Sequence, residues 1–147
     1  MPVSIREAAL DDLLAILALE RDEPSAAHWS ADQYKTRIEN GCLLVAERGN
    51  RICGFLCARV ATGEWEVENV VVAADFRRQG VGIALMRALV ARWQAANGSA
   101  ILLEVRESNQ AARALYEKCG LCETGRRRAY YNGPLEDAVL YTRQRLN

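Results

Sequence analysis

A short glycine-containing segment in the middle of the chain has the composition of an anion-binding turn. Residues 77–82 (RRQGVG) follow the apolar run 70–72 (VVV) and precede apolar residues at helical spacing, Val81, Leu85 and Leu89. Backbone N–H groups at the start of a helix attract anions, and glycines let a phosphate approach closely. The segment therefore predicts a phosphate-binding turn between a strand and a helix. A surface helix start with solvated arginines has the same composition.

Two familiar phosphate-binding motifs are excluded. The chain has no Gly-Lys-Ser/Thr for a nucleoside triphosphate loop, and Leu85 stands where the dinucleotide fingerprint has its third glycine. The turn must therefore serve another phosphate.

A second pair of candidate residues follows the next apolar run, residues 101–105 (ILLEV). Asn109 and Tyr116 are seven positions apart, which places them on one face of a helix, roughly 10 Å apart along its axis. That span suits an extended ligand, with Asn109 bonding amides along it and Tyr116 meeting its reactive end. A helix cap at Asn109 and simple packing of Tyr116 explain the same spacing.

The elements that must position these residues follow from periodicity and turn residues. We expect strands at residues 3–7, 43–47, 52–60, 64–73, 101–105, 121–131 and 138–142. We expect helices at residues 10–20, from Ser30 through residues 34–38, at 80–96, and from Ser108 or Asn109 to Lys118. This order predicts a mixed α/β sheet with helices on both faces.

Composition narrows the function classes. The chain has 147 residues, 50% of them hydrophobic, which predicts one domain over residues 1–147. Nineteen basic residues balance nineteen acidic ones, which argues against direct nucleic-acid binding. The amino terminus lacks a signal-peptide pattern and no apolar run approaches membrane-spanning length, so we expect a soluble, cytoplasmic protein without membrane contact.

Metal and redox sites are not expected. The five cysteines are an odd set, and Cys119 and Cys122 have the spacing of half a zinc site with no second pair or histidine cluster. His28 is the only histidine. Reduced thiols, largely buried, and a lone surface imidazole are the simplest interpretation.

The two candidate segments together resemble the GNAT acetyltransferase superfamily, and within it the RimI-type ribosomal-protein-alanine N-acetyltransferases. The resemblance spans nearly the whole chain and includes residues 68–72 (ENVVV), 77–82, 103–109 (LEVRESN), 114–116 (ALY), 125–131 (GRRRAYY) and 136–138 (EDA). It implies an α/β fold with a mixed, mostly antiparallel central sheet. The chain departs from the family where Ala73-Ala74 replaces Asp-Pro, where His28 replaces proline before Trp29-Ser30, and where Cys119–Cys122 replaces Gly-Phe.

The resemblance also implies the co-substrate, acetyl-coenzyme A, and the residues that hold it. The backbone groups of Val70, Val71 and Val72 are assigned to the acetyl and pantetheine portion. The pyrophosphate is assigned to Arg78, Gln79, Gly80, Val81, Gly82 and Ile83, and the pantetheine arm to Asn109. No metal is implied.

For catalysis, the resemblance implies Glu104 as general base, directly or through water, and Tyr116 as the general acid that protonates the departing thiolate. Glu66 and Glu68 are rival bases, because alternation places them with Glu64 on one face of a strand.

The function implied is transfer of acetyl to the N-terminal α-amine of a protein, with the alanine of a small-subunit ribosomal protein as the acceptor. The alternatives are an acetyltransferase for a small amine or a lysine side chain, and a noncatalytic acyl-coenzyme A-binding sensor. We expect Asn69, Tyr130 and Tyr131 to border the acceptor and Trp29 to pack the flanking loop, with core packing as the alternative for each. Residues 126–128 (RRR) should alternate faces, with two of them in solvent.

Overall fold

The computed structural model describes residues 2–24, 26 and 28–146. Its strands are β1 (Ser4–Glu7), β2 (Cys42–Arg48), β3 (Arg51–Ala61), β4 (Glu64–Val72), β5 (Ala100–Arg106), β6 (Cys122–Tyr131) and β7 (Glu136–Gln144). Its helices are α1 (Leu13–Arg21), α2 (Ala31–Asn40), α3 (Val81–Ala95) and α4 (Gln110–Lys118), with 3-10 turns at Leu10–Asp12 and Ala74–Phe76.

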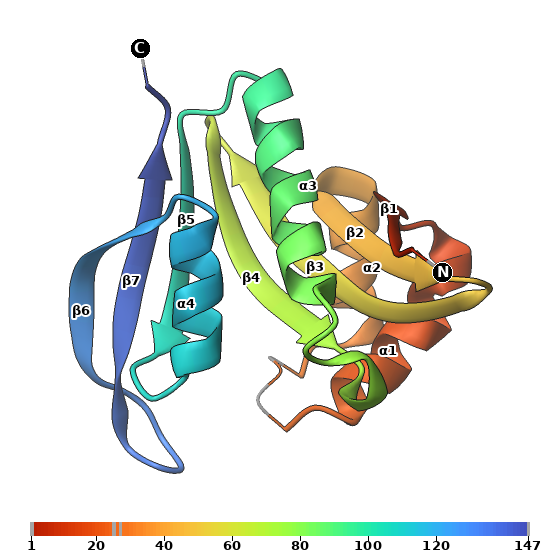
Figure 1. The fold of residues 1–147 in the computed structure, drawn as a ribbon, viewed down its shortest axis with the longest axis horizontal. Coiled ribbons are helices and arrows are strands. Elements are labelled where there is room, and N and C mark those ends of the chain that lie inside the picture. The colour runs from red at the N-terminus through yellow and green to blue at the C-terminus, as the bar shows by residue number, and fades with distance from the viewer. Residues whose placement is uncertain (1, 25, 27, 147) are drawn as a thin grey trace.

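The strands form one sheet in the order β1-β2-β3-β4-β5-β7-β6 (Figure 1). Every neighbouring pair runs antiparallel except β4 and β5, which run parallel. The predicted fold class, a mixed and mostly antiparallel sheet in an α/β protein, is confirmed.

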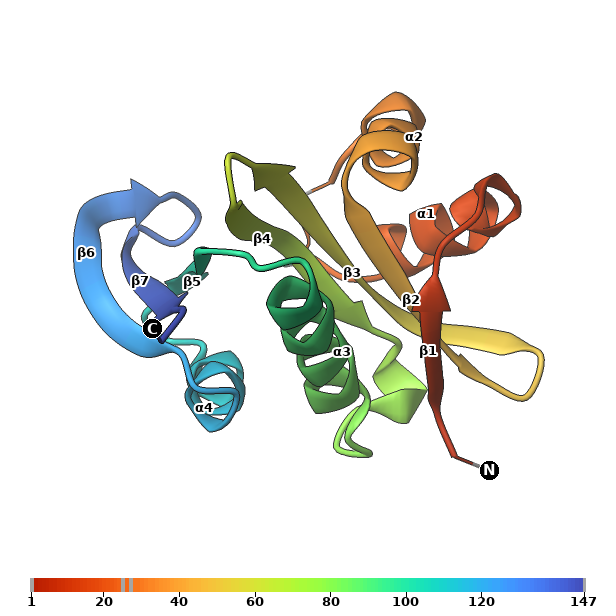
Figure 2. The ribbon, with the colours of Figure 1, turned by 90° about the horizontal axis from the view of Figure 1, so that it is seen from above.

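Helices cover both faces of the sheet, as the sequence predicts. Figure 2 shows α1 and α2 on one side and α3 and α4 on the other. The apolar side chains of α3, among them Leu85 and Leu89, pack with Ile101 of β5 in the larger core cluster. Ile16 of α1 and Tyr34 of α2 belong to the smaller cluster on the opposite face. Both cores rest on the alternation of side chains along the central strands.

Local signals account for most of the helix boundaries. Ser30 caps α2 in a reciprocal pair with Gln33, and Asn109 rather than Ser108 caps α4. The helix expected from residue 10 instead begins with the 3-10 turn, so α1 starts at Leu13. The other expected elements are present, with ends shifted by a few residues at most.

The sheet opens between β4 and β5. Among the described residues, their pairing is confined to Glu64–Glu66 opposite Ala100–Leu102, so the rest of each strand diverges from the other. Figure 1 shows the two strands close together at one end and spread apart at the other. Cys57 of β3 pairs with Asn69 of β4, and the next residue, Ala58, pairs with Val67. Glu68 of β4 is therefore the extra residue of a β-bulge. The opening and the bulge occur at the same level of the sheet.

Candidate active site

The turn before α3 has the geometry of an anion-binding loop. Arg78 and Gly80 both have positive φ, 62° and 81°, and Gly80 is the residue that caps α3. A left-handed residue beside right-handed ones turns successive N–H groups to one side of the chain. At the N-terminus of α3, the first helical hydrogen bond runs from Ala84 N to Gly80 O at 3.1 Å. The amides of residues 81–83 therefore have no partner inside the helix.

A cleft of about 590 Å³ lies against this turn, between α3 and α4. The residues that line it include these predicted cofactor contacts: Val70, Val71, Val72, Arg78, Gly80, Val81, Gly82 and Ile83. Arg77 and Lys118 also line it, so three cationic side chains border the cleft among the described residues. A Cβ on Gly82 would lie 2.9 Å from a methyl carbon of Leu115, so the glycine lets α3 and α4 approach closely beside the cleft.

Two side chains of the predicted phosphate segment are engaged elsewhere. The Gln79 amide accepts a hydrogen bond from Arg48 and donates one to the Asp75 carbonyl, and Gln79 is not among the residues that line the cleft. Arg77 forms an ion pair with Glu23 at the rim. Of the two arginines, Arg78 is therefore the one positioned to offer its charge to a ligand.

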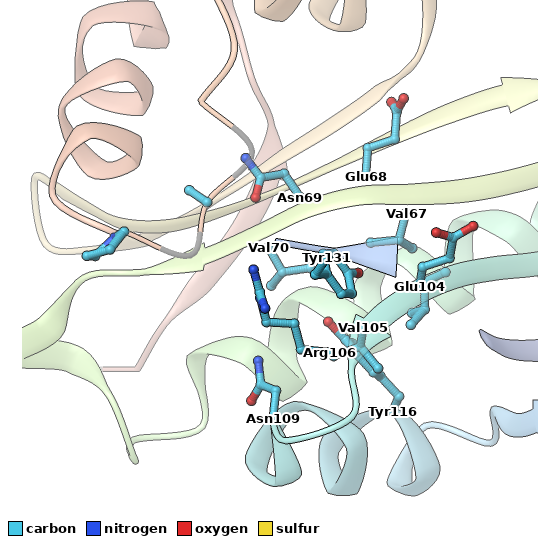
Figure 3. A pocket seen from close by; sticks show the side chains of 13 residues that line it. Val67, Glu68, Asn69, Val70, Glu104, Val105, Arg106, Asn109, Tyr116 and Tyr131 are labelled. Atoms are coloured by element: carbon cyan, nitrogen blue, oxygen red, sulfur yellow. The ribbon is translucent and has the colours of Figure 1, made fainter. Parts of the chain in front are cut away.

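A second pocket, of about 360 Å³, occupies the opening between β4 and β5 (Figure 3). Its walls are residues 67–70 of β4 and 103–106 of β5, closed by Asn109, Tyr116 and Tyr131. Val70 lines both this pocket and the cleft, so the two spaces are adjacent. The structure thus brings Glu104, Tyr116 and Asn109 together in one pocket.

Glu104 reaches this pocket from β5, with its side chain 27% exposed. One carboxylate oxygen lies 3.0 Å from Nε of Arg127 on β6. The arginine triplet that contains Arg127 is exposed at all three positions, not two, because β6 is the edge strand of the sheet. Arg126 pairs with Glu107 and Glu123 instead.

Tyr116 is buried, with 9% of its surface exposed, and its ring centroid lies 6.1 Å from that of Tyr141. Burial, together with the neighbouring Tyr131 and Cys119, raises the pKa of Tyr116 to about 12. The hydroxyl therefore keeps its proton at neutral pH, as a proton donor must.

The rival carboxylates are held by other arginines. Glu68, the bulge residue, lines the pocket and forms a two-point pair with Arg37 of α2, at 2.6 and 3.1 Å. Glu66 lies 3.6 Å from Arg59 and is not among the pocket residues.

Asn109 caps α4 and also lines the pocket. Its side-chain oxygen accepts a hydrogen bond from Ala112 N at 3.2 Å, which caps α4. Its amide nitrogen makes no hydrogen bond within the described part of the chain, and the residue lines the pocket. The cap therefore leaves the donor of this side chain available.

A buried polar network supports one wall of the pocket. Asn69 donates to the hydroxyl of Tyr34 at 2.9 Å, and that hydroxyl donates to Glu20 at 3.2 Å. Glu20 also accepts a hydrogen bond from the backbone of Trp29, in the segment between α1 and α2. Burial, followed by the Glu20 charge, raises the pKa of Tyr34. The network ties that segment to β4.

The other wall is held by Arg106, which the sequence analysis missed. Its guanidinium bonds the carbonyl oxygens of Asn132 and Pro134 and the carboxylate of Glu136, and lies 4.5 Å from the ring centroid of Tyr131. Tyr131 lines the pocket as expected, whereas Tyr130 is half exposed and does not. No sequence spacing joins Arg106 to the β6–β7 hairpin, since the bonded residues are 26 to 30 positions away.

The described part of the chain has neither a cluster of metal ligands nor a membrane-spanning helix. Over residues 2–24, 26 and 28–146, no group of three or more histidine, cysteine, aspartate or glutamate side chains could hold a metal ion. No helix in those ranges is long and apolar enough to span a bilayer. All five cysteines are free thiols, and Cys122 is the exposed one.

Comparison with protein families decides the class of the chain. The model of the acetyltransferase (GNAT) family matches residues 9–121. The chain belongs to this family. The matched span includes the turn, both strands that open, and α4, so the predicted resemblance and the predicted acyltransferase activity are confirmed.

Individual relatives agree with this assignment. The [ribosomal protein bS18]-alanine N-acetyltransferase of Escherichia coli (strain K12) is 36% identical over 95 residues, which are 63% of this chain and 64% of the relative. The N-alpha-acetyltransferase RimI of Mycobacterium tuberculosis is 35% identical over 104 residues, or 68% of this chain and 63% of the relative. These alignments thus span slightly less than two thirds of the relatives' lengths.

A solved structure extends the similarity to nearly the whole chain. The crystal structure of the ribosomal-protein-S18-alanine N-acetyltransferase from Escherichia coli superposes with a TM-score of 0.84 at 29% identity. The superposition covers 96% of this chain and 92% of that structure. GNAT acetyltransferases use acetyl-coenzyme A as the acetyl donor.

Proposed function

We propose that this chain transfers acetyl from acetyl-coenzyme A to the N-terminal α-amine of a protein, with an N-terminal alanine of a ribosomal protein as the first acceptor to test. The observation that carries the proposal is the opening between β4 and β5, where the cleft at α3 and the pocket of Glu104 and Tyr116 are adjacent and share Val70 as a lining residue. The named activities of the relatives support the acceptor class.

The cleft fits the chemistry of the donor. The free amides at the start of α3, with Arg78 and Lys118, suit a diphosphate. The apolar wall that follows, at Val70 and Val72, suits a pantetheine chain. Along the unpaired edge of β4, backbone groups remain available for the amides of that chain. Asn109 would add a side-chain donor near the same path.

In the proposed mechanism, acetyl-coenzyme A supplies an acetyl group on a thiol leaving group. The Glu104 carboxylate takes the proton that the acceptor nitrogen must lose, directly or through a water molecule. As the new C–N bond forms and the C–S bond breaks, the Tyr116 hydroxyl donates its proton to the departing sulfur. The raised pKa of Tyr116 keeps that proton in place until it is needed.

An α-amine fits this arrangement better than a lysine. The α-amine has a pKa near 8, whereas lysine has one near 10.4, so a far larger fraction of the α-amine is neutral at pH 7. A single carboxylate base is then sufficient for the first acceptor and much less so for the second.

The test is thiol release from acetyl-coenzyme A with matched acceptors. An alanine-starting peptide with an internal lysine is compared with the same peptide acetylated at its N-terminus, and with a free polyamine. We expect release with the first acceptor and little with the others. Turnover of the blocked peptide or the polyamine alone would favour the other acetyltransferase reactions. Donor binding without any turnover would instead favour the sensor.

A further inference from the structure

Two carboxylates line the pocket between β4 and β5, and each is paired with an arginine, but the two pairs differ in strength. Glu68 and Arg37 meet through two contacts, and their side chains are only 16% and 19% exposed. Arg37 also lies 5.3 Å from the ring centroid of Trp29. A two-point pair of this kind, stacked and largely out of water, is held firmly in place.

The pair on the predicted base is much looser. Glu104 and Arg127 meet at 3.0 Å, and the Arg127 side chain is 56% exposed. Arg127 lies on the edge strand β6, immediately before a stretch where the pairing with β7 is irregular and Ala129 has a φ of 49°. Its guanidinium also lies 5.7 Å from the centroid of the half-exposed ring of Tyr130. Release of Arg127 into solvent therefore costs little.

The acceptor brings a competing cation to the same carboxylate. If the acceptor is an α-amine, as proposed above, part of it arrives as an ammonium ion at neutral pH. Glu104 must then exchange one cationic partner for another before it can take a proton from the nitrogen. A partly buried carboxylate left without any partner would be unfavourable, which gives Arg127 a purpose in the empty pocket.

We propose that Arg127 holds the place of the acceptor ammonium on Glu104 and leaves when the acceptor binds. Arg127 is then a positioning residue that acts through Glu104. A cationic amine binds Glu104 only if it interacts with the carboxylate more strongly than Arg127 does. Arg37 does not exchange, because its pair with Glu68 has two contacts and little water. The pocket thus has one fixed ion pair and one exchangeable pair. The proposal rests on the proposed function, since it needs an acceptor that carries a positive charge.

The test compares Arg127→Gln, Arg127→Lys and, as a matched control, Arg128→Gln. Arg128 is the exposed neighbour on β6 and makes no ion pair within the described residues. Calorimetry on the full chain saturated with coenzyme A measures binding of an alanine-starting peptide and of the same peptide acetylated at its N-terminus. Steady-state kinetics with acetyl-coenzyme A gives KM and kcat for the free peptide.

We expect Arg127→Gln to tighten binding of the free-amine peptide about 2- to 5-fold, the usual worth of an exposed ion pair. The acetylated peptide, which has no ammonium group, should bind all three variants and the unmodified protein alike. KM should fall more than kcat changes, Arg127→Lys should restore the original KM, and Arg128→Gln should change neither. Arg127→Met, which keeps the aliphatic stem near Tyr130, gives the same comparison if the glutamine variant folds poorly.

The contrary results are equally specific. Weaker binding of the free peptide, or an equal change for both peptides, would show that Arg127 contacts the acceptor or supports the wall, and would overturn the exchange. A lower kcat at unchanged KM would show that it merely holds Glu104 in place. If the unmodified protein turns over a different amine and no peptide, the proposed function fails, and the same variants test the exchange with that amine.

Discussion

The cleft at α3, proposed for the donor (the donor cleft), and the pocket between β4 and β5, proposed for the acceptor (the acceptor pocket), are adjacent, yet they are constructed from different parts of the chain. The backbone groups that the cleft offers come from one continuous stretch, from the end of β4 through the turn to the start of α3, while α4 supplies the facing wall. The pocket depends on side chains that pair across large separations, such as Arg37 with Glu68, 31 positions apart. Asn69 and Tyr34 are 35 positions apart.

This difference predicts how each region responds to substitution. A ligand held by backbone amides loses affinity when the backbone conformation changes, and it tolerates most exchanges of side chain. A pocket held by ion pairs and buried hydrogen bonds changes with each partner that is removed. The donor site should therefore be sensitive at glycines, and the acceptor site at charged and hydroxyl groups.

The largest effect should come from the carboxylate in the acceptor pocket. Glu104→Gln keeps the shape of the side chain and removes the proposed base, so kcat should fall roughly 10²–10⁴-fold. The dissociation constant of acetyl-coenzyme A should stay the same, because Glu104 lies in the pocket and not in the cleft. Steady-state kinetics measures kcat, and calorimetry measures the dissociation constant of acetyl-coenzyme A.

Glu68→Gln is the matched control for that prediction. It removes the other carboxylate of the pocket and breaks the pair with Arg37, so it should raise the acceptor KM more than it lowers kcat. Unchanged turnover in Glu104→Gln together with lost turnover in Glu68→Gln would show that the base is Glu68 of β4.

Loss of the proton donor should have the next largest effect. Tyr116→Phe should lower kcat by roughly 10²-fold, at the small end of the range for proton transfer, because a thiolate leaves without much help. Tyr141→Phe, in the neighbouring ring, removes a hydroxyl that bonds Glu117 at 2.8 Å and should spare kcat.

The pH dependence gives a second measurement on Tyr116. Because its pKa is raised to about 12, the hydroxyl loses its proton only as the pH rises through that value. The kcat profiles of the unmodified protein and of Tyr116→Phe should therefore run parallel up to about pH 10. A decline between neutral pH and about pH 10 that the phenylalanine abolishes would show that the Tyr116 hydroxyl loses its proton in that range, and would contradict the raised pKa rather than the role of proton donor.

The same contrast explains how far the sequence alone could predict this site. The turn, its glycines and the Asn109 cap are local signals, and periodicity places Tyr116 on the same helix. Arg37 reaches Glu68, and Arg127 reaches Glu104, only because α2 and the β6–β7 hairpin fold back toward the pocket, and Arg106 of β5 meets its partner Glu136 for the same reason. Such charges look like ordinary solvated residues in the sequence. The bulge at Glu68 was equally hidden, because it is a property of the pairing between two strands.

The donor site should respond to a change of backbone. Gly80→Ala places a side chain at a φ of 81°, and we expect about tenfold weaker binding of acetyl-coenzyme A and a loss of about 1–2 kcal/mol of unfolding free energy. Gly49→Ala is the matched control, with a φ of 64° and open space around it, in the β2–β3 turn. It should lose similar stability and keep donor affinity, as urea titration and calorimetry can measure. An equal loss of affinity for acetyl-coenzyme A in both variants would show that the turn before α3 does not bind the donor.

The smallest effect separates the helix cap at Asn109 from its proposed contact with the donor. Asn109→Ala and Ser30→Ala each remove a helix cap, so each should lose about 1 kcal/mol of unfolding free energy. Only the first also removes a side-chain donor from the pocket, so it alone should weaken acetyl-coenzyme A binding, about threefold, the worth of one hydrogen bond. Urea titration in the absence of donor and calorimetry with it measure the two quantities separately. If both variants lose stability and neither loses affinity, Asn109 is a cap alone, and the pantetheine arm is held by the backbone of β4 without it.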